Sequence, residues 1–521
     1  MVTLLSEIFL LAEDLGFSWA RMLIALALSF LISLMIGIAA ARSRIVERIT
    51  IPVVDVLQTL PILAFFPFAI FLVVRYLPGV IGINAAVILL IVTSMLWNMI
   101  FGVYEAVKTI PNEFTELAGL YSMGLLSRLR RVFIPASLPR LSKQMQLSWA
   151  IGLFYLVTSE IFSIGNSQYA VQHGIGIALT KLGLAGNVPY YLLGLGMFVL
   201  AVIATKLLLF DSVEKYVTRY ESVRYASTGQ KQKIHLRFPH FGLRMRAKKL
   251  RQRENNNHRA LERVKAGSWY VSYVVAAAVI FIAAFAVYSN WSAISQVSAY
   301  LPYYEELSFV SLAFSFLRVW GAFVLILVVA VPISIYVSFV MVHKEFALTL
   351  FQVLASIPAT ILLPFIASSF KGVYGSSEFI AIVVFFLSGL WYVIFSAISS
   401  VGNTYSSVRE VKSVFGVRGL QLWDKVYFRS MVPGIITGAV TAIAAEWNAS
   451  IVAEYFSSSV IGSGNVISSV SIGIGKLLDN ALSVGNLLLM TVALINMVVM
   501  IILVNRFLWD RLYNFVSKIY R

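Results

Sequence analysis

Two stretches of the sequence, VLQTLPILAFFPF at residues 56–68 and VLASIPATILLPF at residues 353–365, repeat each other and indicate how the chain is built. Aligned prolines lie 297 residues apart: Pro61 with Pro358, and Pro67 with Pro364. The same spacing gives two further pairs, Ser18 with Ser315 and Arg21 with Arg318. A spacing of 294 residues gives four more: Trp97 with Trp391, Glu116 with Glu410, Pro139 with Pro433, and Glu160 with Glu454. Matches at two constant spacings predict an internal duplication.

The composition predicts that both copies lie in a membrane. Of the 521 residues, 59% are hydrophobic and only 12% are charged, whereas about a quarter are charged in an average soluble domain. So few charged side chains cannot cover a protein of 57.8 kDa in water. The chain has no cysteine, which excludes disulfides, thiolate metal sites and cysteine nucleophiles, and its five scattered histidines make a metal site improbable.

Eleven apolar stretches are long enough to cross the bilayer as helices, which takes about 20 residues each. The stretches are continuous, whereas the strands of a membrane barrel would alternate apolar and polar residues. The predicted fold class is therefore an all-α polytopic membrane protein with two parallel five-helix repeats and one connecting helix. The predicted spans lie near residues 20–41, 51–74, 82–104, 146–165, 188–210, 269–288, 307–340, 346–370, 378–402, 433–456 and 483–505.

The connecting span has a topological reason. Five crossings are an odd number, so a second copy fused directly to the first would be inverted, and a sixth crossing restores a parallel orientation. A pathway on the resulting pseudo-two-fold axis would be lined by both copies. The predicted division is a first repeat at 1–210, a basic cytoplasmic linker at 211–268, the connecting helix at 269–288 and a second repeat at 289–521.

The distribution of Lys and Arg predicts the orientation. Most of the 41 basic residues fall in loops that share one side if the chain starts outside, so the C-terminus is expected in the cytoplasm and the N-terminus outside. The net charge of +17 is concentrated in the linker, which includes RMRAKKLRQR at 244–253. A basic segment between membrane spans is expected to meet anionic lipid headgroups rather than nucleic acid.

The longest inner loop of each copy carries a second repeated pattern. The first loop reads PNEFTELAGLYSMGLLSRLRRVFIPASLPR (111–140), and the second reads SSVREVKSVFGVRGLQLWDKVYFRSMVPG (406–434). Each pattern predicts a short amphipathic helix, a glycine break, a basic second helix and a proline at the entrance to the next span. Such a loop can anchor the bundle at the membrane surface or present an apolar ridge to a partner.

These loops resemble the EAA motif of ABC importer permeases, in which a Glu is followed by a Gly and then by an Ile-x-Leu-Pro segment. The resemblance implies contact residues for an ATPase: Glu116, Ser122, Gly124 and Pro135 in the first copy, and Glu410, Gly416, Gly419 and Val426 in the second. Each copy departs from the motif. Ser122 stands at the glycine position, and Arg429 replaces the first proline of the second copy.

The Ser-x-x-Arg pattern, the twin-proline span and the apolar run ending in Glu narrow the resemblance. Together they are similar to duplicated single-chain permeases for nitrate, sulfonate, taurine or bicarbonate. The chain has no G-x-x-x-x-G-K-[ST] motif, so no nucleotide phosphate site of its own is predicted, and no cofactor. The resemblance implies two separate ATPase subunits, an extracytoplasmic substrate-binding protein, a location in the cell membrane and no enzymatic activity in this chain.

Ionisable groups inside a membrane are costly and are candidates for function by default. Glu160 and Glu454 qualify, with two interpretations: they organise the pathway, or they are hydrogen-bonded between helices. A bare carboxylate would repel an anion, so we expect neutralisation by Arg21 or Arg318. Arg21 and Arg318 are themselves interpreted either as snorkelling anchors or as pathway residues that attract the anion.

Pro61, Pro67, Pro358 and Pro364 are expected to kink their helices and are weaker pathway candidates. The glycine-bearing segments 174–179 and 461–465 are interpreted as outer loops that are either flexible connectors or places where a binding protein docks or a gate hinges. Two alternatives to an ABC anion permease stay open: an ATP-independent secondary transporter or channel, and an ABC permease for an unrelated solute.

Overall fold

The computed structural model describes most of both predicted copies. It covers residues 2–59, 79–110, 123–162, 171–217, 300–342, 344–370, 375–401, 423–457, 466–484 and 486–504, with a few isolated residues between these ranges. The connecting span at 269–288 and nearly all of the basic linker lie outside the described residues.

The first copy is a bundle of helices built around α1 and α4. Its elements are α1 (Val2–Arg42), α2 (Arg44–Thr59), α4 (Val80–Lys108), α6 (Leu125–Arg128), the π-helical turn η2 (Leu129–Phe133), α7 (Ile134–Phe162), α8 (Ile175–Leu184), α9 (Val188–Thr205) and η4 (Lys206–Phe210). The helix begun by α9 continues to Val217, so it extends seven residues into the segment predicted as linker.

The second copy repeats this order. Its elements are α13 (Leu301–Phe339), α14 (Lys344–Ala355), α15 (Ala359–Ser369), α16 (Ser376–Val401), η5 (Trp423–Phe428), α19 (Arg429–Glu454), α20 (Ile474–Ser483) and α21 (Leu487–Val504). Short strands β1 (Tyr455–Ser457) and β2 (Val466–Ser469) pair antiparallel between α19 and α20. This ribbon is a small addition to the all-α fold that the sequence predicts.

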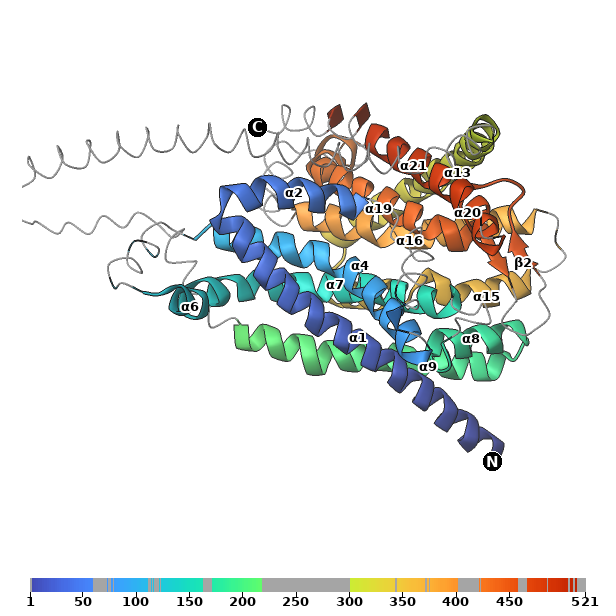
Figure 1. The fold of residues 1–521 in the computed structure, drawn as a ribbon, viewed down its shortest axis with the longest axis horizontal. Helices are drawn as coiled ribbons and strands as arrows, with labels where there is room; N and C mark the ends of the chain where they lie inside the picture. The colour runs from blue at the N-terminus through green and yellow to red at the C-terminus, as the bar shows by residue number, and fades with distance from the viewer. Residues whose placement is uncertain are drawn as a thin grey trace, which may run out of the picture.

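Both copies lie side by side in one helical body (Figure 1). Most blue-to-green helices of the first copy lie in the lower part of the view and most yellow-to-red helices of the second in the upper part, with α2 drawn across the orange helices and α15 beside α8. Helices α7 and α8 contact α15 across the boundary between the copies. Each copy is therefore a helix bundle, and the two bundles contact each other through α7, α8 and α15.

Six helices of the described part are long and apolar enough to cross a membrane, and a bent pair of shorter helices makes a seventh candidate. The predicted spans at 146–165 and 483–505 correspond to α7 and α21, which lie in the same body but are not among these candidates. The structure thus confirms an all-α polytopic membrane protein, while the count of eleven spans stays a prediction.

The outer faces of the first helix of each copy are apolar at equivalent positions. Leu28 and Leu31 on α1 are exposed, as are Leu325 and Val328 on α13. Exposed apolar stripes of this kind are expected on helices that face lipid. Helix α1 has 41 residues, so at about 1.5 Å per residue it is far longer than the roughly 30 Å hydrocarbon core.

The second copy is held together by close approach of α16 and α19. A Cβ atom added at Gly438 would lie 2.7 Å from the Val393 Cα atom and 2.8 Å from the Tyr392 carbonyl oxygen. Gly434 sits equally tightly against Ser396 and Ser400. Small residues let helix backbones meet in this way in membrane proteins, where van der Waals packing replaces the hydrophobic effect between helices.

We therefore expect Gly438→Val to destabilise the protein. The added side chain meets backbone atoms that cannot rotate away, and overpacking of this kind costs about 1–3 kcal/mol. Gly321→Val on α13 is the matched control, because nothing lies within 4 Å of a Cβ atom there. Thermal unfolding of the purified chain measures both variants, and equal midpoints would contradict the close packing of α16 and α19.

Candidate functional site

In the first copy, α1 places Ser18 and Arg21 against Glu160 of α7. The Arg21 Nη1 atom and the Ser18 hydroxyl each donate a hydrogen bond of 2.7 Å to Glu160 Oε1. Glu160 is 0% exposed and Arg21 is 5% exposed. Two opposite charges are thus buried together, which avoids the large cost of burying either one alone.

The same residues also hold the first turn of α8. The Gly176 backbone N–H donates to Glu160 Oε2 at 2.9 Å, and the Ile175 N–H donates to the Ser18 hydroxyl at 2.9 Å. The first N–H groups of a helix have no partner within the helix, and a negative charge near them is favourable. A single carboxylate therefore neutralises Arg21 and caps α8, which ties α1, α7 and α8 together.

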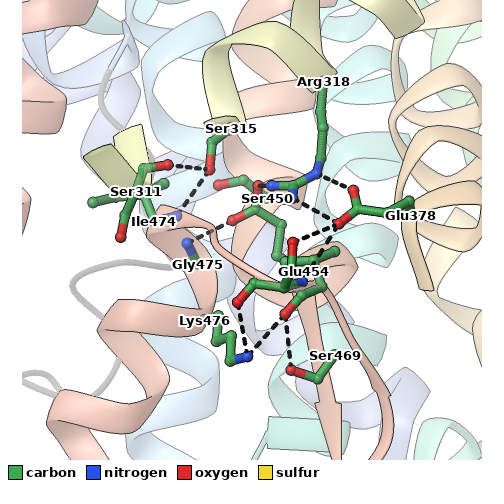
Figure 2. A network of polar contacts seen from close by, with 12 residues as sticks. Ser311, Ser315, Arg318, Glu378, Ser450, Glu454, Ser469, Ile474, Gly475 and Lys476 are labelled. Atoms are coloured by element: carbon green, nitrogen blue, oxygen red, sulfur yellow. Dashed lines mark hydrogen bonds and ion pairs between the residues drawn. The ribbon is translucent and has the colours of Figure 1, made fainter. Parts of the chain in front are cut away.

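The second copy builds a similar arrangement (Figure 2), in which the Ser315 hydroxyl donates to the Ser311 carbonyl oxygen at 3.2 Å. Arg318 Nη1 donates to Glu454 Oε1 at 3.1 Å, and the Gly475 N–H donates to Glu454 Oε2 at 2.8 Å. The Ile474 N–H donates to the Ser315 hydroxyl at 2.8 Å. We call each set a polar knot. The first knot comprises Ser18, Arg21, Glu160, Gly174, Ile175 and Gly176, and the second comprises Ser315, Arg318, Glu454, Gly473, Ile474 and Gly475.

Glycine is required where each carboxylate meets the helix start. A Cβ atom at Gly174 would lie 2.5 Å from Glu160 Cδ, and one at Gly473 would overlap the Glu454 carboxylate in the same way.

The interpretation of 174–179 as a flexible connector is therefore wrong, because this segment forms the start of α8. The segment at 461–465 lies outside the described residues. The actual counterpart of Gly174-Ile175-Gly176 is Gly473-Ile474-Gly475, 299 residues later, a repeat that matching at spacings of 297 and 294 residues does not find.

The two knots differ in the remaining partners of the arginine. Arg21 donates from Nε to Asn84 Oδ1 and from Nη2 to the His173 carbonyl oxygen, both at 2.7 Å. Arg318 donates to both oxygens of Glu378, at 2.5 and 2.9 Å. Glu378 lies 294 residues after Asn84, so a neutral partner in the first copy is replaced by a carboxylate in the second.

A second exchange compensates in part for the first. Asp14 on α1 accepts a hydrogen bond of 3.0 Å from the Gly174 N–H and lies 3.3 Å from His173 Nδ1. The equivalent residue of the second copy, 297 residues on, is Ser311. Each knot therefore includes or adjoins two carboxylates, but only in the second copy does the arginine bind both.

These contacts contradict the interpretation of the arginines as snorkelling anchors. Arg21 and Arg318 do not snorkel to a surface, since both are buried in the middle of long helices and paired. The expected neutralisation of Glu160 by Arg21 and of Glu454 by Arg318 is confirmed. Each knot uses residues of a single copy, and the pathway role of Glu160, Glu454, Arg21 and Arg318 stays a prediction.

A different polar cluster joins the copies. The Tyr155 hydroxyl on α7 donates to Asn448 Oδ1 on α19 at 2.6 Å, and both side chains are buried. The hydroxyls of Thr158 and Thr360 lie 3.4 Å apart on α7 and α15, and both residues are fully buried. We call these four residues the interface cluster. Sequence reasoning missed it because the residues aligned with Tyr155 and Asn448 are Ala449 and Phe154, so no repeat marks the position.

The second half of the bent span of the second copy, α15, lies at the interface with the first copy. Helices α14 and α15 meet at a bend of 71°, and Pro358 stands at the break as the residue before α15. Pro364 lies inside α15, where Gly183 of the first copy packs against it. The predicted kink is therefore present at Pro358, whereas Pro61 and Pro67 of the first copy lie outside the described residues. The Tyr191 hydroxyl of the first copy donates to the Ile361 carbonyl oxygen at 2.9 Å, which adds a further bond between the copies.

The predicted loop helices merge into the spans that follow them. Helices α6, η2 and α7 follow one another without a gap, so the basic segment is continuous with the membrane helix, and Pro139 and Pro433 lie inside α7 and α19 rather than at their starts. Pro135 is the second residue of α7, Gly124 immediately precedes α6, and Glu116 is exposed. Val426 lies in η5. The other predicted contact residues, Ser122, Glu410, Gly416 and Gly419, lie outside the described residues.

Two ion pairs link α2, α4 and α7 of the first copy near the loop at 105–145. Lys108 binds Glu47 at 2.6 Å, and Arg140 pairs with Glu105. Hydrogen bonds from Lys108 and Tyr104 hold the pKa of Glu47 below its usual value. The positions that match Arg140 and Glu105 in the second copy are Gly434 and Ser399, which can make no such pair.

Within the described residues, no group of three or more metal-ligating side chains is present.

The difference between the knots predicts unequal costs for losing the arginines. Arg318→Met leaves the buried Glu454 beside Glu378, whose side chain is 40% exposed, whereas Arg21→Met leaves only the buried Glu160. We expect each single variant to lose about 3–5 kcal/mol of stability, the loss typical of breaking a buried ion pair, with Arg318→Met the worse of the two.

Thermal unfolding of the purified chain tests this order. The double variant Arg21→Met with Glu160→Gln is expected to recover part of the loss, because no uncompensated charge remains. Arg140→Met is the control for a partly exposed pair, which contributes only about 0–1 kcal/mol. Equal midpoints for Arg21→Met and Arg318→Met would rule out the proposed difference.

Comparison with known proteins supports one family. Residues 33–219 match the family described as binding-protein-dependent transport system inner membrane component. The chain is 26% identical over 150 residues to a putative ABC transporter permease protein of Methanocaldococcus jannaschii, which covers 29% of this chain and 55% of that protein. It is also 26% identical over 152 residues to the nitrate import permease protein of Leptolyngbya laminosa, covering 29% and 53%.

The matched part thus spans about half the length of these relatives. The family match begins within α1 and ends after the helix begun by α9, so it includes α7 and α8. Of the first knot it includes Glu160 and the segment 174–176, but not Ser18 and Arg21. The all-α membrane fold agrees with it. Residues 33–219 are therefore similar to the inner membrane component of binding-protein-dependent transport systems, and the chain is an all-α multi-pass membrane protein.

Proposed function

We propose that this chain forms the membrane pathway of an ABC importer for a small anion of the nitrate, sulfonate, taurine or bicarbonate class. The interface cluster is the observation that supports a pathway between the copies. It places the hydroxyls of Tyr155, Thr158 and Thr360 and the amide of Asn448 inside a membrane protein, on three helices from both copies. Buried polar groups at a repeat interface are a typical feature of transport pathways.

The anion class rests on two likenesses. One is the resemblance of the Ser-x-x-Arg and twin-proline patterns to anion permeases, and the other is the similarity of one segment to a protein named as a nitrate import permease. The knots do not offer a free cation to an anion, since Arg21 and Arg318 are both bound to carboxylates. Selectivity would therefore depend on neutral donors of the interface cluster.

The driving force would come from outside the chain. Two separate ATPase subunits would bind the loops at 105–145 and 403–432, and an extracytoplasmic binding protein would deliver the anion. In this arrangement the C-terminus is cytoplasmic and the N-terminus faces outward in the plasma membrane. The continuous run α6–η2–α7 supports a rigid connection, because a push on the loop would move α7, which carries both Tyr155 and Glu160. Rigid-body rocking of the copies would then alternate access to the pathway.

Charge reversal in both loops tests the coupling. We expect the double variant Glu116→Arg with Glu410→Arg to lose ATP-driven uptake of nitrate and of alternative anions into proteoliposomes, because the ATPase contact would be disrupted. Glu306→Arg is the matched control, since it reverses an exposed carboxylate at the start of α13. Uptake that persists in the double variant, or that needs no nucleotide, would favour a secondary transporter or channel.

A cysteine pair tests the pathway itself. The chain contains no cysteine, so Thr158→Cys with Thr360→Cys introduces the only thiols. The parent hydroxyls lie 3.4 Å apart, so we expect a disulfide to form and to block uptake by holding the copies together. Reduction should restore uptake, and each single variant is the control. Full uptake in the oxidised pair would show that the copies do not separate at this point during transport.

A further inference from the structure

A third buried carboxylate, Glu446, lies on α19 two turns before Glu454. Glu446 is 0% exposed, and neither of its carboxyl oxygens has a hydrogen-bond partner among the described residues. Its Oε1 atom lies against α16, 3.0 Å from the place where a Cβ atom of Gly389 would be. The other groups around that point are apolar, namely the Ile326 side chain of α13 and the Ala442 side chain of α19.

This environment differs from that of Glu160 and Glu454, the other two carboxylates that are 0% exposed among the described residues. Glu160 and Glu454 each bind an arginine and a helix start, whereas the carboxyl oxygens of Glu446 have no hydrogen-bond partner among the described residues. An ionised carboxylate in such a place would lose its hydration with no compensating contact, at an effective cost of several kcal/mol. A metal cation would need several oxygen ligands, and no group of three or more metal-ligating side chains exists in the described part of the chain.

The duplication shows what kind of side chain fits here. The residues that align with Glu446 and Gly389 in the first copy are Gly152 and Met95. There the Met95 side chain packs onto Gly152, whereas in the second copy the Glu446 side chain packs onto Gly389. In the first copy the long side chain is on α4 and the glycine on α7, whereas in the second copy the glycine is on α16 and the long side chain on α19. A neutral methionine fills in one copy the space that a glutamate fills in the other, so the space accommodates an uncharged side chain of this length.

We propose that Glu446 is a proton-binding site: in this conformation its carboxyl group carries a proton taken from solvent and is neutral. The site exists in the second copy only. Release of the proton requires water to reach the carboxyl group, and therefore requires separation of α16 from α19 or from α13. The residues that meet the carboxyl group where α13, α16 and α19 come together, Ile326, Gly389 and Ala442, do not titrate, so burial there favours the neutral form.

Infrared spectroscopy of the full chain in lipid nanodiscs tests the site. A protonated carboxyl group has a C=O stretching band separate from the bands of carboxylates, and the band shifts in D₂O. At neutral pH we expect this band in the native chain and expect Glu446→Gln to remove it. Glu305→Gln is the matched control, because Glu305 is exposed on α13 and accepts a hydrogen bond from Asn496.

A band that survives in Glu446→Gln, or no band in the native chain, would overturn the proposal. Glu446→Met provides a second measurement by thermal unfolding. We expect Glu446→Met to unfold within a few degrees of the native chain, because methionine has the shape and neutrality of a protonated glutamate. A large loss of stability would show that Glu446 is ionised and bound to a partner, and would also contradict the proposal.

Discussion

The structure depends on one constraint: a guanidinium group buried in a membrane must be neutralised where it lies. Arg21 and Arg318 sit in the middle of the longest helices, and each finds its carboxylate on the helix that follows the long inner loop. The same carboxylate then fixes the start of a short helix through backbone N–H groups. Because one carboxylate both neutralises the arginine and caps the short helix, the positions of α1, α7 and α8, and of their counterparts, are determined together.

Fusion of the copies has allowed them to diverge while this constraint is kept. Asn84 and Glu378 occupy the same place, and so do Asp14 and Ser311, so the second carboxylate has moved between positions without being lost. The bond from Tyr155 to Asn448 occurs once, because the aligned residues are Ala449 and Phe154. A dimer of identical chains would have to repeat each such change on both sides of its axis.

Much of the architecture followed from the sequence, and what was missed has physical causes. Repeated Ser-x-x-Arg and Glu positions predicted the pairing of Arg21 with Glu160, because an unpaired charge in a membrane is unfavourable whatever the fold. The role of Gly174 could not be predicted, since only the folded chain shows how close the carboxylate approaches. Tyr155, Asn448 and Glu446 escaped notice because repeat matching finds residues that stayed alike, whereas these positions differ between the copies.

The first knot also has a consequence for the order in which the chain is made. Arg21 is synthesised well before Glu160, and Gly176 follows later still, so the arginine enters the bilayer while its eventual partners do not yet exist. A lone arginine at mid-helix costs about 2.5–3.5 kcal/mol during insertion. The apolar residues of α1 must supply this energy by themselves. The strongly hydrophobic sequence of α1 is therefore needed while this helix is inserted into the membrane, before any tertiary contact can form.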